Sequence, residues 1–449
     1  MNNQISIQIA LQSAEFVLSE ISRVNSLSFE ERMERIRADS REGFGCLWGH
    51  PKFHPLECGR AALAEFENIV AYSLTRQPDL RAKISWREIH GAVTYAFVDR
   101  FIAKSQNLSS QTIQAMADAA CNHARKKLSN HTLVIPCRLW TQEIPDEIAV
   151  GPIRFIRAKK FFESLPETSL KVIQDDLHER VERFAMDSGW TAVVSVQSVD
   201  RVTAERRVQM AVDAGICILK LLVGPTRTRR CRRASEWGPS AFHGYFVVGK
   251  DGVLEPAATI GGSEDIVWEN WKDILTDGDE RRWVFEFASS SIDGILNPEA
   301  CLPLQSRFLD ALKWFGEGVS ETSPAARLTK YVFAWERLVA TSKEADVTRL
   351  VSSRSAHLIA YTVGSRGDDL MRELIRLYDV RSRLAHGSQS PWANYELEKF
   401  ADESEALTVR LLIGSLLHYW NLNQGGGTDS DLSKSFEVLD SSPPPQAEE

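Results

Sequence analysis

The stretch Leu377-Tyr-Asp-Val-Arg-Ser-Arg-Leu-Ala-His-Gly387 is the most informative sequence for predicting the fold of the C-terminal part of the chain. At about 100° per residue, residues 370–386 form one amphipathic helix. Its apolar face is formed by Leu370, Leu374, Leu377, Tyr378, Leu384 and Ala385. Arg381 falls near the middle of that face, and His386 lies off its edge at the helix end. Because a charge on a packed face is costly unless it is paired or functional, Arg381 requires an explanation.

Helical patterns surround this stretch on both sides. After Pro298, apolar residues recur at helical spacing in three further main segments, marked by Phe308–Phe315, Leu328–Val339 and Tyr395–Trp420, with a shorter helix at Val347–Tyr361. The links between the segments are mostly short, which is typical of an antiparallel four-helix bundle. We therefore expect an all-α four-helix-bundle domain over residues 299–423, with Arg381 and His386 on its third main helix.

The preceding part of the chain has a different character. Residues 1–130 are mainly helical by pattern, and residues 131–298 form an α+β region of unknown role. In that region strands are expected at 132–140, 149–156, 190–199 and 283–287, and Gly249-Lys-Asp-Gly252 marks a hairpin turn. Residues 424–449 begin with Gln-Gly-Gly-Gly and are acidic, so we expect a disordered tail. The predicted fold class is a multidomain protein, an N-terminal mixed α+β region followed by the all-α bundle.

Composition excludes several classes of protein. The chain has 449 residues, 43% hydrophobic and 25% charged, as in ordinary globular proteins. Its net charge of −8 provides no overall basic field for nucleic acid, although local patches can still bind it. No secretory signal, membrane span or cysteine framework is evident, so we expect a cytoplasmic protein without a membrane partner. No nucleotide-binding glycine motif or hydrolase serine elbow occurs.

The stretch Leu377–Gly387 resembles the signature of HEPN domains, specifically their Apea-like branch. Ala311-Leu-Lys-Trp314 and Phe333-Ala-Trp-Glu-Arg-Leu-Val339 stand at matching places in the first two helices. The resemblance covers roughly residues 300–423. It implies a metal-independent endoribonuclease without a cofactor, acting on RNA as a homodimer whose two Arg/His motifs meet across the interface. It also implies a bacterial setting, with a role in antiphage defence or toxin-like growth arrest.

Residue chemistry agrees with what the resemblance implies. Histidine titrates near neutral pH, so His386 suits the proton transfers of RNA cleavage. The guanidinium of Arg381 keeps its charge and can bind a phosphate bidentately. Ser382 occupies the polar position after the arginine where Asn, Asp or His is common in the family. Glu336 and Tyr378 are supporting candidates, Glu336 as a positioning residue for Arg381.

An alternative interpretation gives the same residues no catalytic role. Arg381 would be a buried arginine paired with Glu336, and His386 would cap the helix. The protein would then be a non-catalytic HEPN protein that binds RNA or a protein partner and uses the bundle to dimerise.

Two further clusters of residues are candidate binding sites. Cys46, His50, His54 and Cys58 recur at a uniform spacing and are a candidate zinc site, which would make the amino end a zinc-dependent binding module. The alternative is an ordinary aromatic-rich turn. Five arginines stand between Thr226 and Arg233 and are the best candidate for an RNA-phosphate patch, namely Arg227, Arg229, Arg230, Arg232 and Arg233. The alternative for these is a solvated loop.

Overall fold

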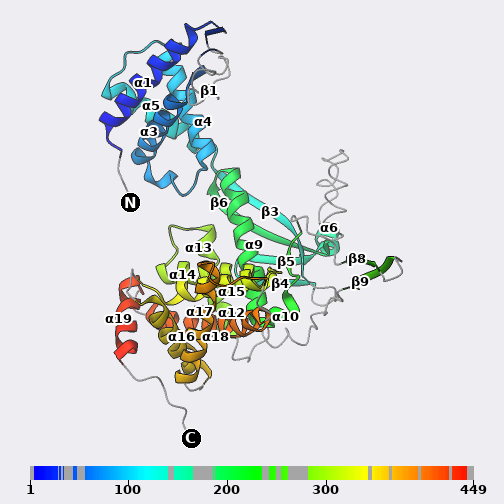
Figure 1. The fold of residues 1–449 in the computed structure, drawn as a ribbon. Helices are drawn as coiled ribbons and strands as arrows, with labels where there is room; N and C mark the ends of the chain where they lie inside the picture. The colour runs from blue at the N-terminus through cyan, green and yellow to red at the C-terminus, as the bar shows by residue number, and fades with distance from the viewer. Residues whose placement is uncertain are drawn as a thin grey trace. The chain divides into compact units, whose positions relative to one another are not determined.

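The computed structural model describes residues 5–28, 30–31, 34, 44–47, 56–139, 146–164, 186, 188–234, 242–248, 254–260, 282–341, 346–363, 367–392, 396–423 and 427–441. The chain divides into two compact units, residues 1–131 with 196–206, and residues 132–195 with 207–449. The predicted α+β region and the predicted helical region both contribute to the second unit. Figure 1 gives the order of the elements along the chain.

The first unit is helical, with one short hairpin. Its helices are α1 (Ile7–Asn25), α3 (Arg60–Arg76), α4 (Trp86–Phe97), which runs into a π-helical turn at Val98–Ala103, and α5 (Ser110–Arg125). Serine hydroxyls cap the starts of α1, α4 and α5, as expected for backbone N–H groups without a helical partner. Strands β1 (Phe44–Leu47) and β2 (Leu56–Gly59) pair antiparallel. The apolar faces of the helices form one core around Phe66 and Phe97.

A five-stranded sheet carries the β structure of the second unit. Its order is β4 (Glu147–Val150), β5 (Ile153–Arg157), β6 (Trp190–Val199), β3 (Ser129–Arg138) and β7 (Arg232–Arg233). The pairs β4–β5, β5–β6 and β3–β7 are antiparallel. Helix α9 (Arg201–Val223) packs on this sheet through Gly215, where a Cβ would lie 2.7 Å from Ile153. Short helices α6 (Ala158–Glu163) and α10 (Pro225–Thr228) and the hairpin β8 (Phe242–Val248)–β9 (Leu254–Ile260) complete the described part of this region.

The C-terminal region is all-helical. It contains α12 (Arg282–Ser290), α13 (Asp293–Leu296), α14 (Pro303–Ser320), α15 (Pro324–Val339), α16 (Val347–Val363), α17 (Gly367–Ala385), α18 (Leu397–Asn423) and α19 (Asp429–Ser441). Helices α14 to α18 pack together, with α15 in contact with the other four (Figure 1). Trp335 of α15 is fully buried, and its indole N–H donates to Thr408 of α18 at 2.8 Å.

An ionic cluster around the buried Arg327 joins α15 to α18. Arg327 is 1% exposed and donates to Glu398, Asp402 and Glu405 at 2.8, 2.8 and 3.0 Å. The Tyr331 hydroxyl also donates to Glu405. Burial, followed by the charge of Glu405, raises the pKa of Tyr331, so its hydroxyl stays protonated and remains a donor. This cluster fixes the register of the helix that carries Glu336.

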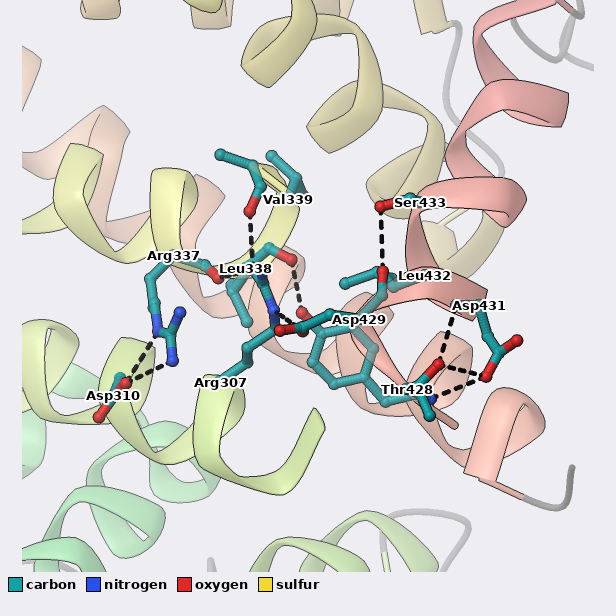
Figure 2. A network of polar contacts seen from close by, with 12 residues as sticks. Arg307, Asp310, Arg337, Leu338, Val339, Thr428, Asp429, Asp431, Leu432 and Ser433 are labelled. Atoms are coloured by element: carbon teal, nitrogen blue, oxygen red, sulfur yellow. Dashed lines mark hydrogen bonds and ion pairs between the residues drawn. The ribbon is translucent and has the colours of Figure 1, made fainter. Parts of the chain in front are cut away.

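Side chains from neighbouring helices also hold the end of α15. Arg307 of α14 donates to the carbonyls of Arg337 and Ala340, Tyr419 to that of Leu338, and Arg354 to that of Val339. The two arginines are in turn paired with α19, Arg307 with Asp429 at 2.6 Å and Arg354 with Asp440 at 2.9 Å. Figure 2 shows Arg307 between the end of α15 and Asp429. Carbonyls that a helix end leaves without partners are thereby satisfied.

Three expectations from the sequence require correction. The strand expected at 283–287 is part of helix α12, because Val284, Phe285, Phe287 and Ala288 are buried at helical spacing. The helix at 347–361 is not a minor one. It spans 17 residues, against 16 in α15, so the described bundle has five helices where four main helices were expected. Part of the predicted disordered tail is helix α19, whose Leu432 and Phe436, four residues apart, are fully buried.

Candidate functional site

Arg381 lies on α17 against the side of α15. Its side chain is 17% exposed, and its guanidinium lies 3.5 Å from the carboxylate of Glu336. The guanidinium carbon stands 4.8 Å from the ring centre of Phe333 and 5.6 Å from that of Tyr378. Two aromatic faces and one carboxylate therefore explain how a charge is tolerated on this helix face. The buried Nε of Arg381 has no hydrogen-bond partner among the described residues, so the guanidinium is incompletely satisfied.

Glu336 has a stronger partner than Arg381. The Tyr378 hydroxyl donates to Glu336 Oε1 at 2.6 Å, and Arg381 approaches the same oxygen at 3.5 Å. Burial, with the hydrogen bond to Glu336 as the second cause, raises the pKa of Tyr378, so the phenol stays protonated at neutral pH. The carboxylate is held by a short, charge-assisted hydrogen bond, while the guanidinium makes only a long contact to it.

His386 occupies the C-terminal cap of α17. The Ser388 N–H donates to the Arg383 carbonyl at 3.0 Å and the Gly387 N–H to the Leu384 carbonyl at 3.2 Å. These two bonds and the φ of +72° at Gly387 define a Schellman motif, with glycine at the left-handed position. Gly387 is thus the C′ residue of α17, and the turn leaves the His386 side chain exposed.

Arg381 and His386 point in different directions from helix α17. Positions five residues apart on an α-helix differ by about 140°. Arg381 is directed toward Glu336 of α15, and His386 stands exposed at the helix end. Ser382 is half-buried beside Arg381. The structure therefore brings together Arg381, Glu336 and Tyr378, and it leaves His386 outside that contact.

Phe333 is a member of the site that the sequence did not single out. It precedes Glu336 by three residues, which places both on one helix face, and it lies under the Arg381 guanidinium. Trp314 of α14 packs against it at 5.1 Å between ring centres. Its spacing of three residues from Glu336 was the sequence feature that could have placed Phe333 at the site.

The five arginines between residues 227 and 233 do not form a single loop patch. Arg232 and Arg233 lie on strand β7, paired with Arg138 and Cys137 of β3. Arg233 forms an ion pair with Asp213 at 2.6 Å, and Arg229 lies 3.5 Å from Glu405 of α18. Arg227 and Arg230 are exposed. The five positions thus divide between the sheet edge and the end of α10, which argues for a partly structural role.

Two of the four candidate zinc ligands can be placed. Cys46 lies on β1 and Cys58 on β2, one position out of register across the hairpin. Burial raises the pKa of Cys58 to about 11, with a contribution from Cys46. His50 and His54 lie outside the described residues. Within the described ranges, no group of three or more His, Cys, Asp or Glu side chains is arranged to hold a metal ion. All seven cysteines are free thiols.

The chain matches no protein-family model, no curated protein and no solved structure. Among the described helices, none has both the length and the apolar character required to cross a membrane.

Proposed function

We propose that the chain is a HEPN-type endoribonuclease of the Apea-like branch, cleaving RNA without a metal through Arg381 and His386 in a homodimer. The proposal is supported by the unequal contacts that Tyr378 and Arg381 make with the Glu336 carboxylate. Tyr378 holds the carboxylate at 2.6 Å, and Arg381 contacts it at only 3.5 Å. A phosphate can therefore replace Glu336 as the partner of Arg381 without leaving the carboxylate unpaired.

The reaction assigned to this site needs no group other than these side chains. The 2′-hydroxyl loses its proton to a neutral imidazole and attacks the adjacent phosphorus, forming the O2′–P bond. The P–O5′ bond breaks, and a protonated imidazole gives its proton to the departing 5′-oxygen. Arg381 stabilises the charge on the phosphorane oxygens. The products are a 2′,3′-cyclic phosphate and a 5′-hydroxyl.

Two imidazoles are required in this scheme, and each chain supplies one. His386 is exposed at a helix end and is about 140° around the helix from Arg381. A second chain facing this end of α17 would bring its own His386 to the same phosphate. The homodimer is thus part of the proposal, and RNA is its substrate. In a bacterial cell such an activity would act in antiphage defence or as a toxin.

A second candidate function, binding without catalysis, is supported by the contacts of Arg381 within one chain. Arg381 is already stacked on Phe333 and paired with Glu336 within one chain, as the alternative interpretation requires. Under that alternative the protein binds RNA or a protein partner, and the bundle serves only to dimerise. In that case, Arg381→Ala would destabilise the fold without changing any chemistry.

A cleavage assay separates the two functions. Purified protein is incubated with RNA in excess chelator, beside His386→Ala and Arg381→Ala variants verified as folded. Arg383→Ala is the matched control, since Arg383 is half-exposed on the same turn and pairs with Asp379. The proposal expects cleavage by the parent and the control, and loss of at least a hundred-fold in the two site variants. Equal cleavage by all four proteins, or by none, would reject it.

A further inference from the structure

Trp392 is the most exposed large hydrophobic side chain among the described residues, at 95% of its free surface. Tryptophan is usually well buried because it presents a large apolar area. An indole held in water therefore suggests a partner that is absent from the isolated chain. Its backbone N–H donates to Ser390 Oγ at 3.3 Å, and the exposure of the side chain shows that nothing among the described residues covers the ring.

The turn after α17 keeps Trp392 near the candidate site. The Gln389 N–H donates to the Arg383 carbonyl at 3.2 Å, which folds residues 387–389 back onto the helix end beside His386. Three residues further on, the Cα of Trp392 is within about 11 Å of the Cα of Gln389, the limit set by a fully extended chain. The exposed indole and the exposed imidazole thus stand at the same end of α17.

The surroundings favour a single flat ligand over a protein surface. Protein interfaces have contiguous apolar cores, but the residues preceding Trp392 are Ser388, Gln389, Ser390 and Pro391. Ser388, Ser390 and Pro391 are exposed. An exposed aromatic ring that follows polar, exposed residues offers a stacking face, which is how proteins hold an unpaired nucleic-acid base.

We infer that Trp392 is a stacking platform for an unpaired base of RNA bound at the Arg381/His386 site. The inference rests on the proposed function for the site itself, and it adds a substrate class, single-stranded RNA. A base stacked on the indole would hold the adjacent backbone over the helix end where His386 is exposed. A base in a duplex is already stacked on its neighbours and cannot use this platform.

Binding of labelled RNA by the His386→Ala protein tests the inference without cleavage. We expect adding Trp392→Ala to raise the Kd for a single-stranded oligoribonucleotide roughly ten-fold, the scale for losing one stacked base. Trp392→Phe should keep most of the affinity. Trp86→Ala, which removes another exposed indole (48%) on α4, is the matched control and should have no effect. With an abasic oligonucleotide, or with duplex RNA, the Trp392→Ala change should make no difference.

Several outcomes would reject the role of Trp392 as a stacking platform. These are an unchanged Kd for single-stranded RNA, an equal loss of affinity for abasic RNA, or no measurable RNA binding by the parent. A fourth is a change in sedimentation mass of the RNA-free Trp392→Ala protein, which would assign the indole to a contact between chains. Failure of the proposed function is distinguishable, because cleavage that survives Arg381→Ala and His386→Ala would reject the nuclease site and leave a Trp392-dependent Kd standing.

Discussion

Tyr378 lies 0.9 Å closer than Arg381 to the same carboxylate oxygen of Glu336, at 2.6 Å against 3.5 Å. The phenol therefore satisfies the carboxylate, and the arginine is the more easily exchanged of its two partners. An arginine on a packed helix face is thus stabilised by aromatic stacking while its charge stays available.

Replacing Glu336 with Gln should strengthen RNA binding. The amide keeps a hydrogen bond to Tyr378 but no longer attracts the guanidinium, so Arg381 is freer to bind phosphate. In the His386→Ala background we expect a several-fold lower Kd for RNA at low salt, with up to about 1 kcal/mol lost from unfolding stability. Glu317→Gln removes the same charge from an exposed pair with Lys313 and is the control. A weaker affinity for RNA in Glu336→Gln would show that the carboxylate positions Arg381 and does not compete for it.

Gly387 should be replaceable only by residues that tolerate a left-handed backbone. No atom lies within 4 Å of a Cβ built there, so the φ of +72° is the only obstacle. Gly387→Ala should lower the unfolding free energy by about 1 kcal/mol, and Gly387→Asn by less. If His386 acts in cleavage, the alanine variant should also cleave more slowly, because the turn that exposes the imidazole is strained. Equal stability of the two variants would contradict the Schellman assignment.

Arg327 should be among the most sensitive positions in the bundle. Arg327→Met leaves Glu405, whose side chain is 9% exposed, without its main counter-charge. A loss of about 3–5 kcal/mol is expected from breaking a buried pair on one side. Arg349→Met, in an exposed pair with Asp346, should cost less than about 1 kcal/mol. Chemical denaturation followed by circular dichroism measures both, and similar losses would mean that the Arg327 cluster is solvated in solution.

Acidification should weaken the docking of α19. The His418 ring stacks on Phe436 and contacts the Ser435 hydroxyl at 2.9 Å, and burial lowers the pKa of His418. The unfolded state therefore binds this proton more readily, so stability rises with pH. This contribution to stability is lost as the pH falls from the pKa of histidine in the unfolded state, about 6.5, through the lower pKa of His418 in the folded state. The melting temperature should drop between about pH 7.5 and 5.5 in the parent, and less in His418→Gln. An equal drop in both would assign the effect to other groups.

Much of the helical framework followed from periodicity, since α14, α15, α17 and α18 each bury residues three and four apart. The sequence did not indicate α19, because this acidic segment after Gly-Gly-Gly holds only four apolar residues. Of these, the structure buries two, Leu432 and Phe436. Their burial depends on the ion pairs of Arg307 and Arg354 with Asp429 and Asp440, which only the folded bundle brings together. At the site, the pairing of Arg381 with Glu336 was predicted as one of two alternatives. The stacking on Phe333 was not, because it depends on how α15 and α17 cross.

We propose that the exposed His386 and the stacked Arg381 cleave RNA through its 2′-hydroxyl. The most direct measurement compares RNA with 2′-O-methyl RNA of the same sequence in excess chelator, with analysis of the product ends. Only the unmodified RNA should be cut, leaving 2′,3′-cyclic phosphate and 5′-hydroxyl ends, and His386→Ala should abolish the cut. Cleavage of the 2′-O-methyl strand, or products with 3′-hydroxyl and 5′-phosphate ends, would contradict it.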